Sequence, residues 1–316
     1  MAVALNEWLQ LVDSEYLNDF VVEGGAAVKF IVSDEKVIET LKQQSQRQAE
    51  AHGLFFAIID SAEVKLHLIQ DLFFAVSRQA DWTADAQRFV ERLFKSNGYQ
   101  WPCHGQPVPL EDLADGNGVD AKILKKEFNQ WLTKSVMHDI GMAQDFRIAI
   151  TRLCLNCLVP ADGSAESEAP IHQWLRGELQ RIGPLRAAEI YAKITRHNAR
   201  AMLRSLCRWL RLAGHKGMLL AIDIRQVTKA IPTGVAGVRF TPSAVMDAYE
   251  VLRQLIDDID LFEGLFVVVM ADRGFLGDDP KRSVSAYQAL KMRIWDDVKA
   301  RSRDNPLAPL VVLNAA

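Results

Sequence analysis

The stretch "AVKFIVSDEKVIETL", residues 27–41, contains a strand, a very short turn and a helix in direct succession. The apolar run 27–32 has the length of a buried strand, and apolar residues return at helical spacing after Glu35. In a protein that binds nucleotide phosphates, such a junction carries a glycine-rich loop. The junction therefore decides the fold class, and it raises the question of why no glycine-rich loop stands between the strand and the helix.

Strands and helices alternate along the rest of the chain. The pattern predicts a doubly wound α/β fold with a mainly parallel, five-stranded sheet. The apolar segments with the composition of buried parallel strands are 27–32, 54–59, 218–222, 265–270 and 310–313. Helical periodicity occupies 35–51, 62–78, 84–96, 187–213 and 243–258.

A helical insertion is expected between the second and third strands. Two stretches rich in Pro, Gly and acidic residues, 98–118 and 159–170, bracket a segment that reads as helical from Val119 to Leu158. We expect residues 159–170 to form a mobile loop. The predicted organisation is a first part of the α/β domain at 1–100, the helical insertion with flexible linkers at 101–170, and a second part of the α/β domain at 171–316.

Composition indicates a soluble, cytoplasmic protein. Of the 316 residues, 49% are hydrophobic and 24% are charged, which is enough apolar material for a sizeable core. We expect no membrane association, because no signal peptide or membrane-spanning apolar run is present. Four cysteines make no disulfide framework. The formal net charge of -3 gives no global attraction to nucleic acid, although a local basic face can still provide one.

The phosphate-loop pattern G-x-x-x-x-G-K-[ST] fails in both possible registers. With Lys29 as its lysine, the loop would lie inside the strand. With Lys36, the lysine opens a helix, but only Ser33, Asp34 and Glu35 remain of the loop, with no glycine. We expect Ser33 to be the N-cap, with the two acidic residues occupying the positive helix end that a phosphate needs. In this interpretation the loop is deleted.

Acidic residues end the third and fourth predicted strands. Asp223 stands where nucleotide hydrolases carry a magnesium ligand, whereas Ile224 stands where many of them carry a glutamate that orients the attacking water. Asp272 and Arg273 follow the fourth strand, at the edge where open α/β sheets bind ligands. If a nucleotide binds, the candidate residues are Lys36, Asp223, Asp272 and Arg273; the alternatives are caps and solvated ion pairs.

With these residues in place, the chain resembles the P-loop domain family of ATP-binding proteins of BREX-type phage-exclusion systems, which is related to the AAA+ ATPases. The resemblance rests on ordered blocks over nearly the whole chain, including "EYLNDFVVEGGAAVKF", "ITRHNARAMLRSLCRWLRLAGHKGMLLAIDI" and "DAYEVLRQLIDDIDLFEGLFVVVMADRGFLGDD". It implies a sheet of P-loop NTPase type, association with a helicase, an ATPase or other partners in a bacterial defence system, and DNA as a target. The chain departs from active members at the loop and at Ile224. Because it ends at "LVVLNAA", no helical lid is expected after the fifth strand.

A basic stripe precedes the third strand. Its arginines repeat every three or four residues, which stacks them on one helix face, and they would bind nucleic-acid phosphates in a salt-dependent way. The alternatives are a solvated face and pairing with the acidic residues of "DDIDLFE", 257–263. The stripe consists of Arg196, Arg200, Arg204, Arg208 and Arg211.

Other candidates favour structural roles. Cys154 and Cys157 form a C-x-x-C without a second ligand pair, so we expect core residues. Asp257, Asp258 and Asp260 are expected at a solvated helix end or as partners of the stripe. The sequence contains neither the G-x-S-x-G motif of hydrolases, nor the zinc-binding H-E-x-x-H motif, nor the dinucleotide-binding G-x-G-x-x-G motif. We therefore predict no catalytic residue and no metal ligand.

The function predicted from these features is a non-catalytic pseudo-ATPase subunit of a bacterial antiphage defence complex, which binds partner proteins and DNA without a cofactor. The alternative is an AAA+-like ATPase of the same context that uses ATP and Mg²⁺ at an unorthodox or shared site built from Lys29 or Lys36 with Asp223 and Asp272. A third possibility is a structural homo-oligomer.

Overall fold

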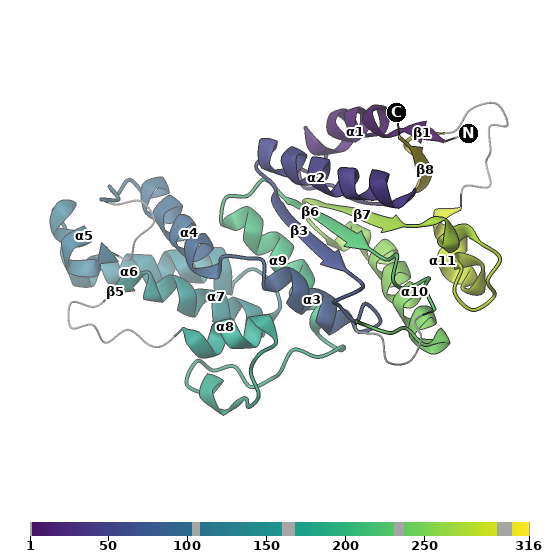
Figure 1. Ribbon diagram of the computed structural model, residues 1–316. Helices are drawn as coiled ribbons and strands as arrows, with labels where there is room; N and C mark the ends of the chain where they lie inside the picture. The colour runs from purple at the N-terminus through teal and green to yellow at the C-terminus, as the bar shows by residue number, and fades with distance from the viewer. Residues whose placement is uncertain (1, 103–107, 160–167, 231–236, 296–304, 316) are drawn as a thin grey trace. The chain divides into compact units, whose positions relative to one another are not determined.

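The computed structural model describes residues 2–102, 108–159, 168–230, 237–295 and 305–315. Two compact units divide the chain, residues 1–76 with 215–316, and Ser77–Gly214. The first holds the sheet (Figure 1). Among the described residues, no helix combines the length and the apolar character needed to cross a membrane.

The sheet unit contains a six-stranded sheet in which every pairing is parallel. All five predicted strands are present. The sixth, at the sheet edge, consists of only Val3 and Ala4, too short to leave a periodic pattern, so the expected count of five is wrong by one. In spatial order the strands are β1 (Val3–Ala4), β8 (Leu310–Asn314), β2 (Ala26–Val32), β7 (Leu265–Ala271), β6 (Met218–Asp223) and β3 (Phe55–Asp60).

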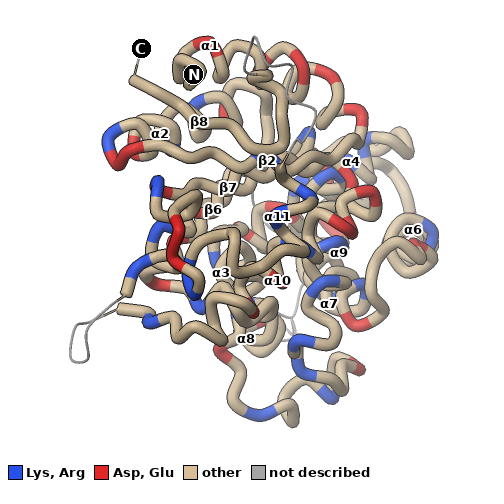
Figure 2. The backbone as a smooth tube through the Cα atoms, turned by 90° about the vertical axis from the view of Figure 1, so that its right-hand side faces the viewer, with Lys and Arg blue, Asp and Glu red and all other residues tan. Residues whose placement is uncertain are grey.

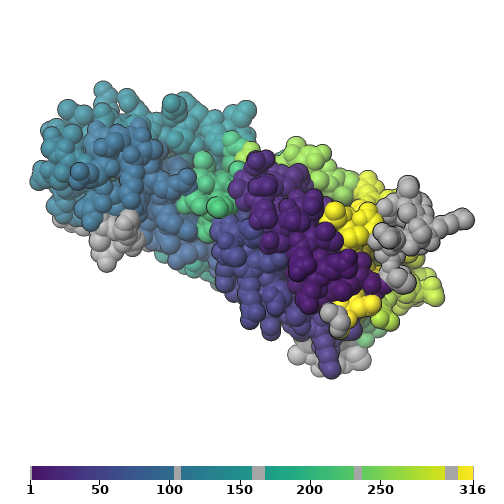
Figure 3. All heavy atoms as spheres, turned by 90° about the horizontal axis from the view of Figure 1, so that it is seen from above, coloured from purple at the N-terminus to yellow at the C-terminus, as the bar shows by residue number. Residues whose placement is uncertain are grey.

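The two ends of the described chain meet in this sheet. Val3 of β1 lies opposite Leu313 of β8. Figure 3 shows the purple N-terminal residues against yellow C-terminal ones. The C-terminal strand therefore joins β1 to the centre of the sheet, because its other edge pairs with β2 from Phe30 to Val32.

The central strands are buried on both faces. Every residue of β6 and β7 is buried, which explains why these strands read as uninterrupted apolar runs. Helices α1 (Leu5–Val12) and α2 (Glu35–Ala51) cover one face, and α10 (Pro242–Asp257) and α11 (Gln288–Ile294) the other (Figure 1). The sheet is thus doubly wound, as predicted.

Short helices complete this unit. The bounds are η1 (Asp13–Leu17), α3 (Ile69–Ser77, which ends at the unit boundary), η4 (Ile259–Leu261), η5 (Arg273–Leu276) and η6 (Val284–Ala286). Helix α3 begins later than the periodicity from residue 62 indicates. The reason is that the Asp60 carboxylate accepts a hydrogen bond from the Ala62 N–H at 2.7 Å, which holds a turn after β3.

In its described residues, the second unit, Ser77–Gly214, consists of helices, connecting loops and turns, and one short ladder of two strands. Its elements are α4 (Trp82–Ser96), β4 (Val108–Pro109), α5 (Leu110–Gly116), α6 (Ala121–Leu132), η2 (Thr133–Met137), α7 (Gln144–Asn156), β5 (Leu158–Val159), α8 (Ala169–Arg176), η3 (Gly183–Leu185) and α9 (Ala199–Leu212). The expected linkers fall partly on residues 103–107 and 160–167, outside the described residues.

This unit is wider than the insertion expected at 101–170, because flanking helices share its core. The Trp82 ring at the start of α4 lies 6.0 Å from Phe146 of α7, and Phe89 of α4 lies 5.3 Å from Trp209 of α9. Helix α9 starts at Ala199 and not near 187. Just before it, the Asn198 side chain accepts from the Thr195 N–H and donates to the Lys193 carbonyl, which stabilises a turn.

The C-x-x-C cysteines lie in the core of the second unit. Cys154 and Cys157 are buried at the end of α7. Burial raises the pKa of the Cys157 thiol to about 12 and that of Cys154 well above its ordinary value. Both side chains are therefore neutral thiols at physiological pH, in agreement with the predicted packing role.

Candidate functional site

The junction between β2 and α2 consists of two residues. β2 ends at Val32 and α2 begins at Glu35. The Asp34 carboxylate accepts from the Val37 N–H at 3.0 Å, so Asp34 is the N-cap and the prediction of Ser33 is wrong. Ser33 still belongs to the sheet, since its N–H donates to Ala271 and its hydroxyl donates to the Leu313 carbonyl at 2.8 Å.

The carboxyl ends of the strands are aligned beside this junction. Asp60 of β3 lies opposite Asp223 of β6, which in turn lies opposite Met270 of β7. Val32 of β2 lies opposite Ala271, also on β7. The start of α2 and Asp223 therefore share one edge of the sheet, where open α/β sheets bind ligands.

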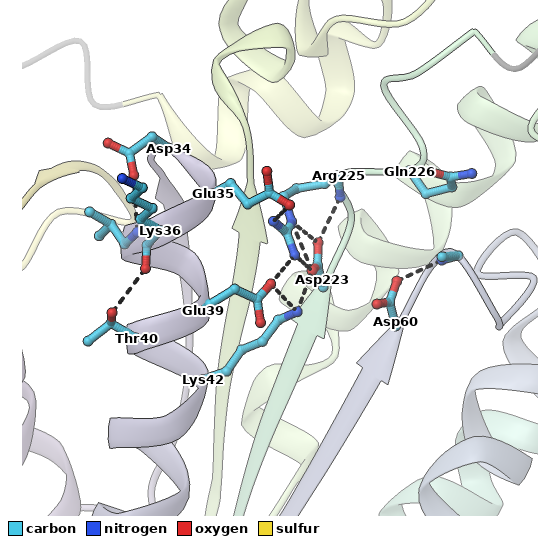
Figure 4. A network of polar contacts seen from close by, with 12 residues as sticks. Asp34, Glu35, Lys36, Glu39, Thr40, Lys42, Asp60, Asp223, Arg225 and Gln226 are labelled. Atoms are coloured by element: carbon cyan, nitrogen blue, oxygen red, sulfur yellow. Dashed lines mark hydrogen bonds and ion pairs between the residues drawn. The ribbon is translucent and has the colours of Figure 1, made fainter.

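Asp223 is the centre of a polar network at this edge (Figure 4). Its buried carboxylate accepts two hydrogen bonds from the Arg225 Nε, at 3.0 and 2.9 Å, and one from an Arg225 terminal nitrogen at 2.6 Å. The Arg225 backbone N–H adds a bond at 3.0 Å. On the side of α2, the Lys42 ammonium lies 2.8 Å from the same carboxylate. Both carboxylate oxygens are thus occupied by cationic groups of this chain.

Two further carboxylates on α2 complete the network. Glu39 lies 2.5 Å from an Arg225 terminal nitrogen and 3.1 Å from the Lys42 ammonium. Glu35 lies 3.8 Å from Arg225. The network consists of Asp223 and Arg225 together with Glu35, Glu39 and Lys42, so that three acidic groups meet two basic ones.

The charges shift one another's pKa values in favour of the ionised forms. Burial alone would raise the pKa of Asp223, but the hydrogen bonds from Arg225 and Lys42 outweigh it and hold the pKa below its ordinary value of 3.8. Burial would likewise lower the pKa of Lys42, yet the Asp223 carboxylate keeps it raised. The hydrogen bond to Asp223 also raises the pKa of Arg225. All three groups are charged at neutral pH.

The lowered pKa of Asp223 predicts a loss of stability in acid. A group whose pKa is depressed by folding stabilises the folded state above its ordinary pKa, and this contribution disappears as the pH falls through the folded-state value. We therefore expect the free energy of unfolding to decline below about pH 4, and to decline less steeply in Asp223→Asn. Urea unfolding at a series of pH values measures this, and equal acid slopes in both proteins would contradict it.

The two candidate phosphate lysines lie apart from this network. Lys29 is buried inside β2, where its ammonium donates to the Leu307 carbonyl and lies 4.9 Å from the centre of the Tyr16 ring. Lys36 is exposed, and Figure 4 shows its side chain on the side of α2 away from Asp223. Within the described ranges, no hydrogen bond or ion pair joins either lysine to Asp223.

Asp272 and Arg273 follow β7 on the same edge. Asp272 is the N-cap of η5, and its carboxylate accepts from the Gly274 N–H at 2.9 Å and from the Thr228 hydroxyl at 3.1 Å. Arg273 is exposed. The structure thus brings Asp223 together with α2, while Asp272 has its own capping role. The position of the water-orienting acid is held by Ile224, which is fully buried.

The arginine stripe is divided between a turn and a helix. Arg196 lies in the turn before α9, whereas the other four lie on α9. Arg196 and Arg200 are exposed, and Arg204, Arg208 and Arg211 are half-buried. The Arg208 Nε donates to the Asp139 carboxylate within the same unit. Asp257, the alternative partner considered for the stripe, is bound by Arg253 and Arg293.

Sequence reasoning missed Lys42, Arg225 and Glu39. Some signal was present, because Glu39 and Lys42 have the spacing of a helical ion pair and Arg225 follows the strand-end Asp223 by two residues. The contact between Arg225 and Glu39 spans 186 positions of the chain, however. It could be predicted only with the strand order already known.

One comparison with known proteins identifies a family. Residues 112–315 match a family model described as BREX system ATP-binding protein BrxC/D. The matched segment includes β6, β7 and β8 with Asp223 and Arg225, but not β2, α2 or β3. No curated protein and no solved structure matches the chain significantly. Because the family model covers more than half of the 316 residues, the chain belongs to the BREX system ATP-binding protein family BrxC/D.

Proposed function

We propose that the chain is a non-catalytic, P-loop-derived subunit of a BREX phage-defence complex, a pseudo-ATPase that contributes binding surfaces. Family membership connects it with the BREX system. The observation that carries the non-catalytic part is the two-residue junction of Ser33 and Asp34 between β2 and α2. The alternation and order of the strands support the P-loop derivation, since β2 lies between β7 and β8 and its carboxyl end faces the edge that holds Asp223.

The junction does not fit a triphosphate. A phosphate loop presents several backbone N–H groups of a glycine-rich turn. Here the Ser33 N–H is used by Ala271 and the Val37 N–H by the Asp34 carboxylate. The carboxylates of Asp34 and Glu35 add negative charge at the helix start, where a phosphate would need positive potential. Phosphate binding would therefore require this helix end to be rebuilt.

The strand-end acid does not fit magnesium in this arrangement either. Mg²⁺ is held by carboxylate oxygens together with phosphate oxygens and water. Both Asp223 oxygens already accept hydrogen bonds from Arg225, and Lys42 lies against one of them. A metal ion would have to displace two cationic side chains from a buried carboxylate. We infer that Lys42 and Arg225 occupy the place of the cation.

The test is thermal unfolding with and without millimolar ATP and Mg²⁺. We expect no shift of the midpoint, because a ligand stabilises a protein only by binding its folded state, by about 2.7 kcal/mol at one hundred times its dissociation constant. For a protein of this size that would be a rise of roughly 5 to 10 °C. A rise of that size would contradict the proposal and favour the second candidate.

The second candidate is an ATPase of the same system with an unorthodox or shared site. It is favoured by the description of the family as ATP-binding and by the retention of Asp223 and Asp272 at one sheet edge. Its residues would be Lys29 or Lys36 with these two aspartates and Arg273, and its cofactors ATP and Mg²⁺. If a nucleotide-dependent shift exists and disappears in Lys36→Ala, this candidate replaces the first.

We also propose that α9 contributes to nucleic-acid binding. The exposed guanidiniums of Arg196 and Arg200 support this, together with the row of Arg204 and Arg211 behind them. Within the same unit, the Arg208 Nε donates to the Asp139 carboxylate. We further propose that the chain binds partner proteins of the defence system, such as a helicase or an ATPase.

A further inference from the structure

One face of the helical unit carries four lysines that form no ion pair with any other described residue. Helix α6 and the turn η2 form one continuous helical segment from Ala121 to Met137. A wide-open surface groove runs along it; its lining residues all lie between Lys122 and His138 and include the four lysines of this segment. We call them the lysine face: Lys122, Lys125, Lys126 and Lys134.

The hydrophobic pattern of the segment explains why these lysines point outward. Leu124, Phe128, Leu132 and Val136 are buried and repeat every four residues, so they form a single apolar stripe. The lysines lie on the opposite side and are all exposed. Figure 2 shows basic residues in blue on α6. Because the apolar stripe packs into the core of the unit, the lysines on the other side of the helix point to solvent.

The lysine face has no acidic counterpart. The segment contains one acidic side chain, Glu127, whose carboxylate accepts from the Tyr99 hydroxyl at 2.6 Å on the flank of the helix. No carboxylate lines the groove. In the ranges that the structure describes, no ion pair involves any of the four lysines. The face is therefore positive although the whole chain has a formal net charge of -3.

The remaining side chains of the groove are also hydrogen-bond donors or small polar groups. Asn129, Gln130, Thr133 and His138 are exposed between and beyond the lysines. Such side chains share phosphate contacts with lysine in nucleic-acid complexes. No Phe, Tyr or Trp side chain lines the groove, and the imidazole of His138 is its single ring, so the groove offers no row of rings on which successive unpaired bases could stack. These side chains therefore suit the phosphate backbone of duplex DNA better than single-stranded DNA.

The length of the face suits contact with several phosphates. Lys122 and Lys134, the ends of the face, are twelve positions apart, or roughly 18 Å along a helix. A DNA strand advances about 3.4 Å of axis for each phosphate and winds around the duplex as it does so, which lets a straight helix of this length meet several phosphates but not an unbroken row. An isolated small anion would need only one or two of the lysines. We propose that the lysine face is a binding site for the phosphodiester backbone of duplex DNA, without preference for sequence.

This inference goes beyond the proposed function, because it depends neither on the nucleotide site nor on the arginines of α9. The two basic elements are nevertheless neighbours in the helical unit. His138 ends the groove, and the next residue, Asp139, binds Arg208 of α9. The Asp139–Arg208 pair thus joins the end of the lysine face to α9.

The test is binding of the full chain to a fluorescent duplex of random sequence, followed by anisotropy between about 50 and 200 mM salt. Each neutralised phosphate contributes about 0.9 to the slope of log affinity against log salt. We expect Lys122→Gln with Lys126→Gln to reduce this slope by about two and to weaken binding by about tenfold at low salt. Lys134→Gln, at the other end of the face, is expected to reduce the slope by about one.

The matched control is Lys229→Gln with Lys281→Gln, which removes the same charge from two exposed positions of the sheet unit. It is expected to keep the wild-type slope. Absence of binding by the wild type, or equal slopes in the control and in the Lys122/Lys126 variant, overturns the proposal. Loss of binding only in Arg200→Glu with Arg204→Glu would also overturn it and would leave α9 as the DNA site. Unchanged melting temperatures exclude unfolding as the cause.

Discussion

Replacing Arg225 by alanine is expected to lower the free energy of unfolding by about 2 to 3 kcal/mol. The reason is that the Asp223 side chain is 2% exposed and accepts most of its hydrogen bonds from Arg225. Losing one partner of a buried pair leaves an uncompensated charge, which costs about 3 to 5 kcal/mol when no other partner remains. Lys42, 2.8 Å away, would still compensate part of it. Urea unfolding measures the change.

Two further variants test whether the loss of stability comes from the buried Asp223 carboxylate. Arg225→Lys keeps the charge but cannot bind both carboxylate oxygens through a planar fork, so its stability should lie between those of the wild type and Arg225→Ala. Arg293→Ala removes another paired arginine from the same unit, but its partner Asp257 is one-third exposed and is also bound by Arg253. Exposed pairs contribute about 0 to 1 kcal/mol. Equal losses in Arg225→Ala and Arg293→Ala would show that the network is only a surface ion pair.

The stability of this network bears on function. An ATPase needs a strand-end carboxylate that can exchange its partners for a metal ion as nucleotide binds and leaves. A carboxylate fixed by a bidentate arginine and a lysine exchanges them only at the full cost of breaking a buried pair. A large effect of Arg225→Ala would therefore support a structural role for Asp223, in line with the short β2–α2 junction.

The parts of the fold that could be predicted from the sequence are those determined by local patterns. β6 and β7 are predicted to within one residue because their side chains are buried on both faces, which leaves unbroken apolar runs. β1, with only Val3 and Ala4, has no such pattern and is held in place by β8. Periodicity also overestimates α9, since the turn at Asn198 depends on its side-chain hydrogen bonds.

In the candidate site too, the features that could be predicted are those determined by consecutive residues. The absence of a glycine-rich loop is a property of consecutive residues, so it is visible at Ser33 and Asp34 without any structure. The partners of Asp223 could not be predicted, because Lys42 and Arg225 come from elements that meet only through the order of the strands. The exact cap was also missed: Ser33 and Asp34 are both good N-cap residues, and only the continued sheet pairing of Ser33 decides between them.

The largest effect on stability is expected in the helical unit, for Phe94→Ala. The Phe94 ring is fully buried, with ring centres of Trp101, Phe128 and Trp131 between 5.2 and 5.4 Å away. Truncating a buried phenylalanine costs about 3 to 5 kcal/mol, and its aromatic contacts place this one near the middle of that range or above it. Hydrogen exchange should show lost protection in α4 and α6, while the amides of β6 and β7 keep theirs.

The control is Ile123→Ala, on the same helix as Phe128 but 58% exposed, for which a loss within about 0.5 kcal/mol is expected. Phe94→Ala also distinguishes the packing that holds α6 in place from the lysine contacts that α6 makes with DNA. Phe128 holds α6 through its buried side, so Phe94→Ala should weaken DNA binding at the lysine face by loosening the helix, although it removes no charge. The salt slope of the binding that remains should be that of the wild type. A reduced slope would mean that lysine contacts are lost outright and that α6 does not refold on DNA.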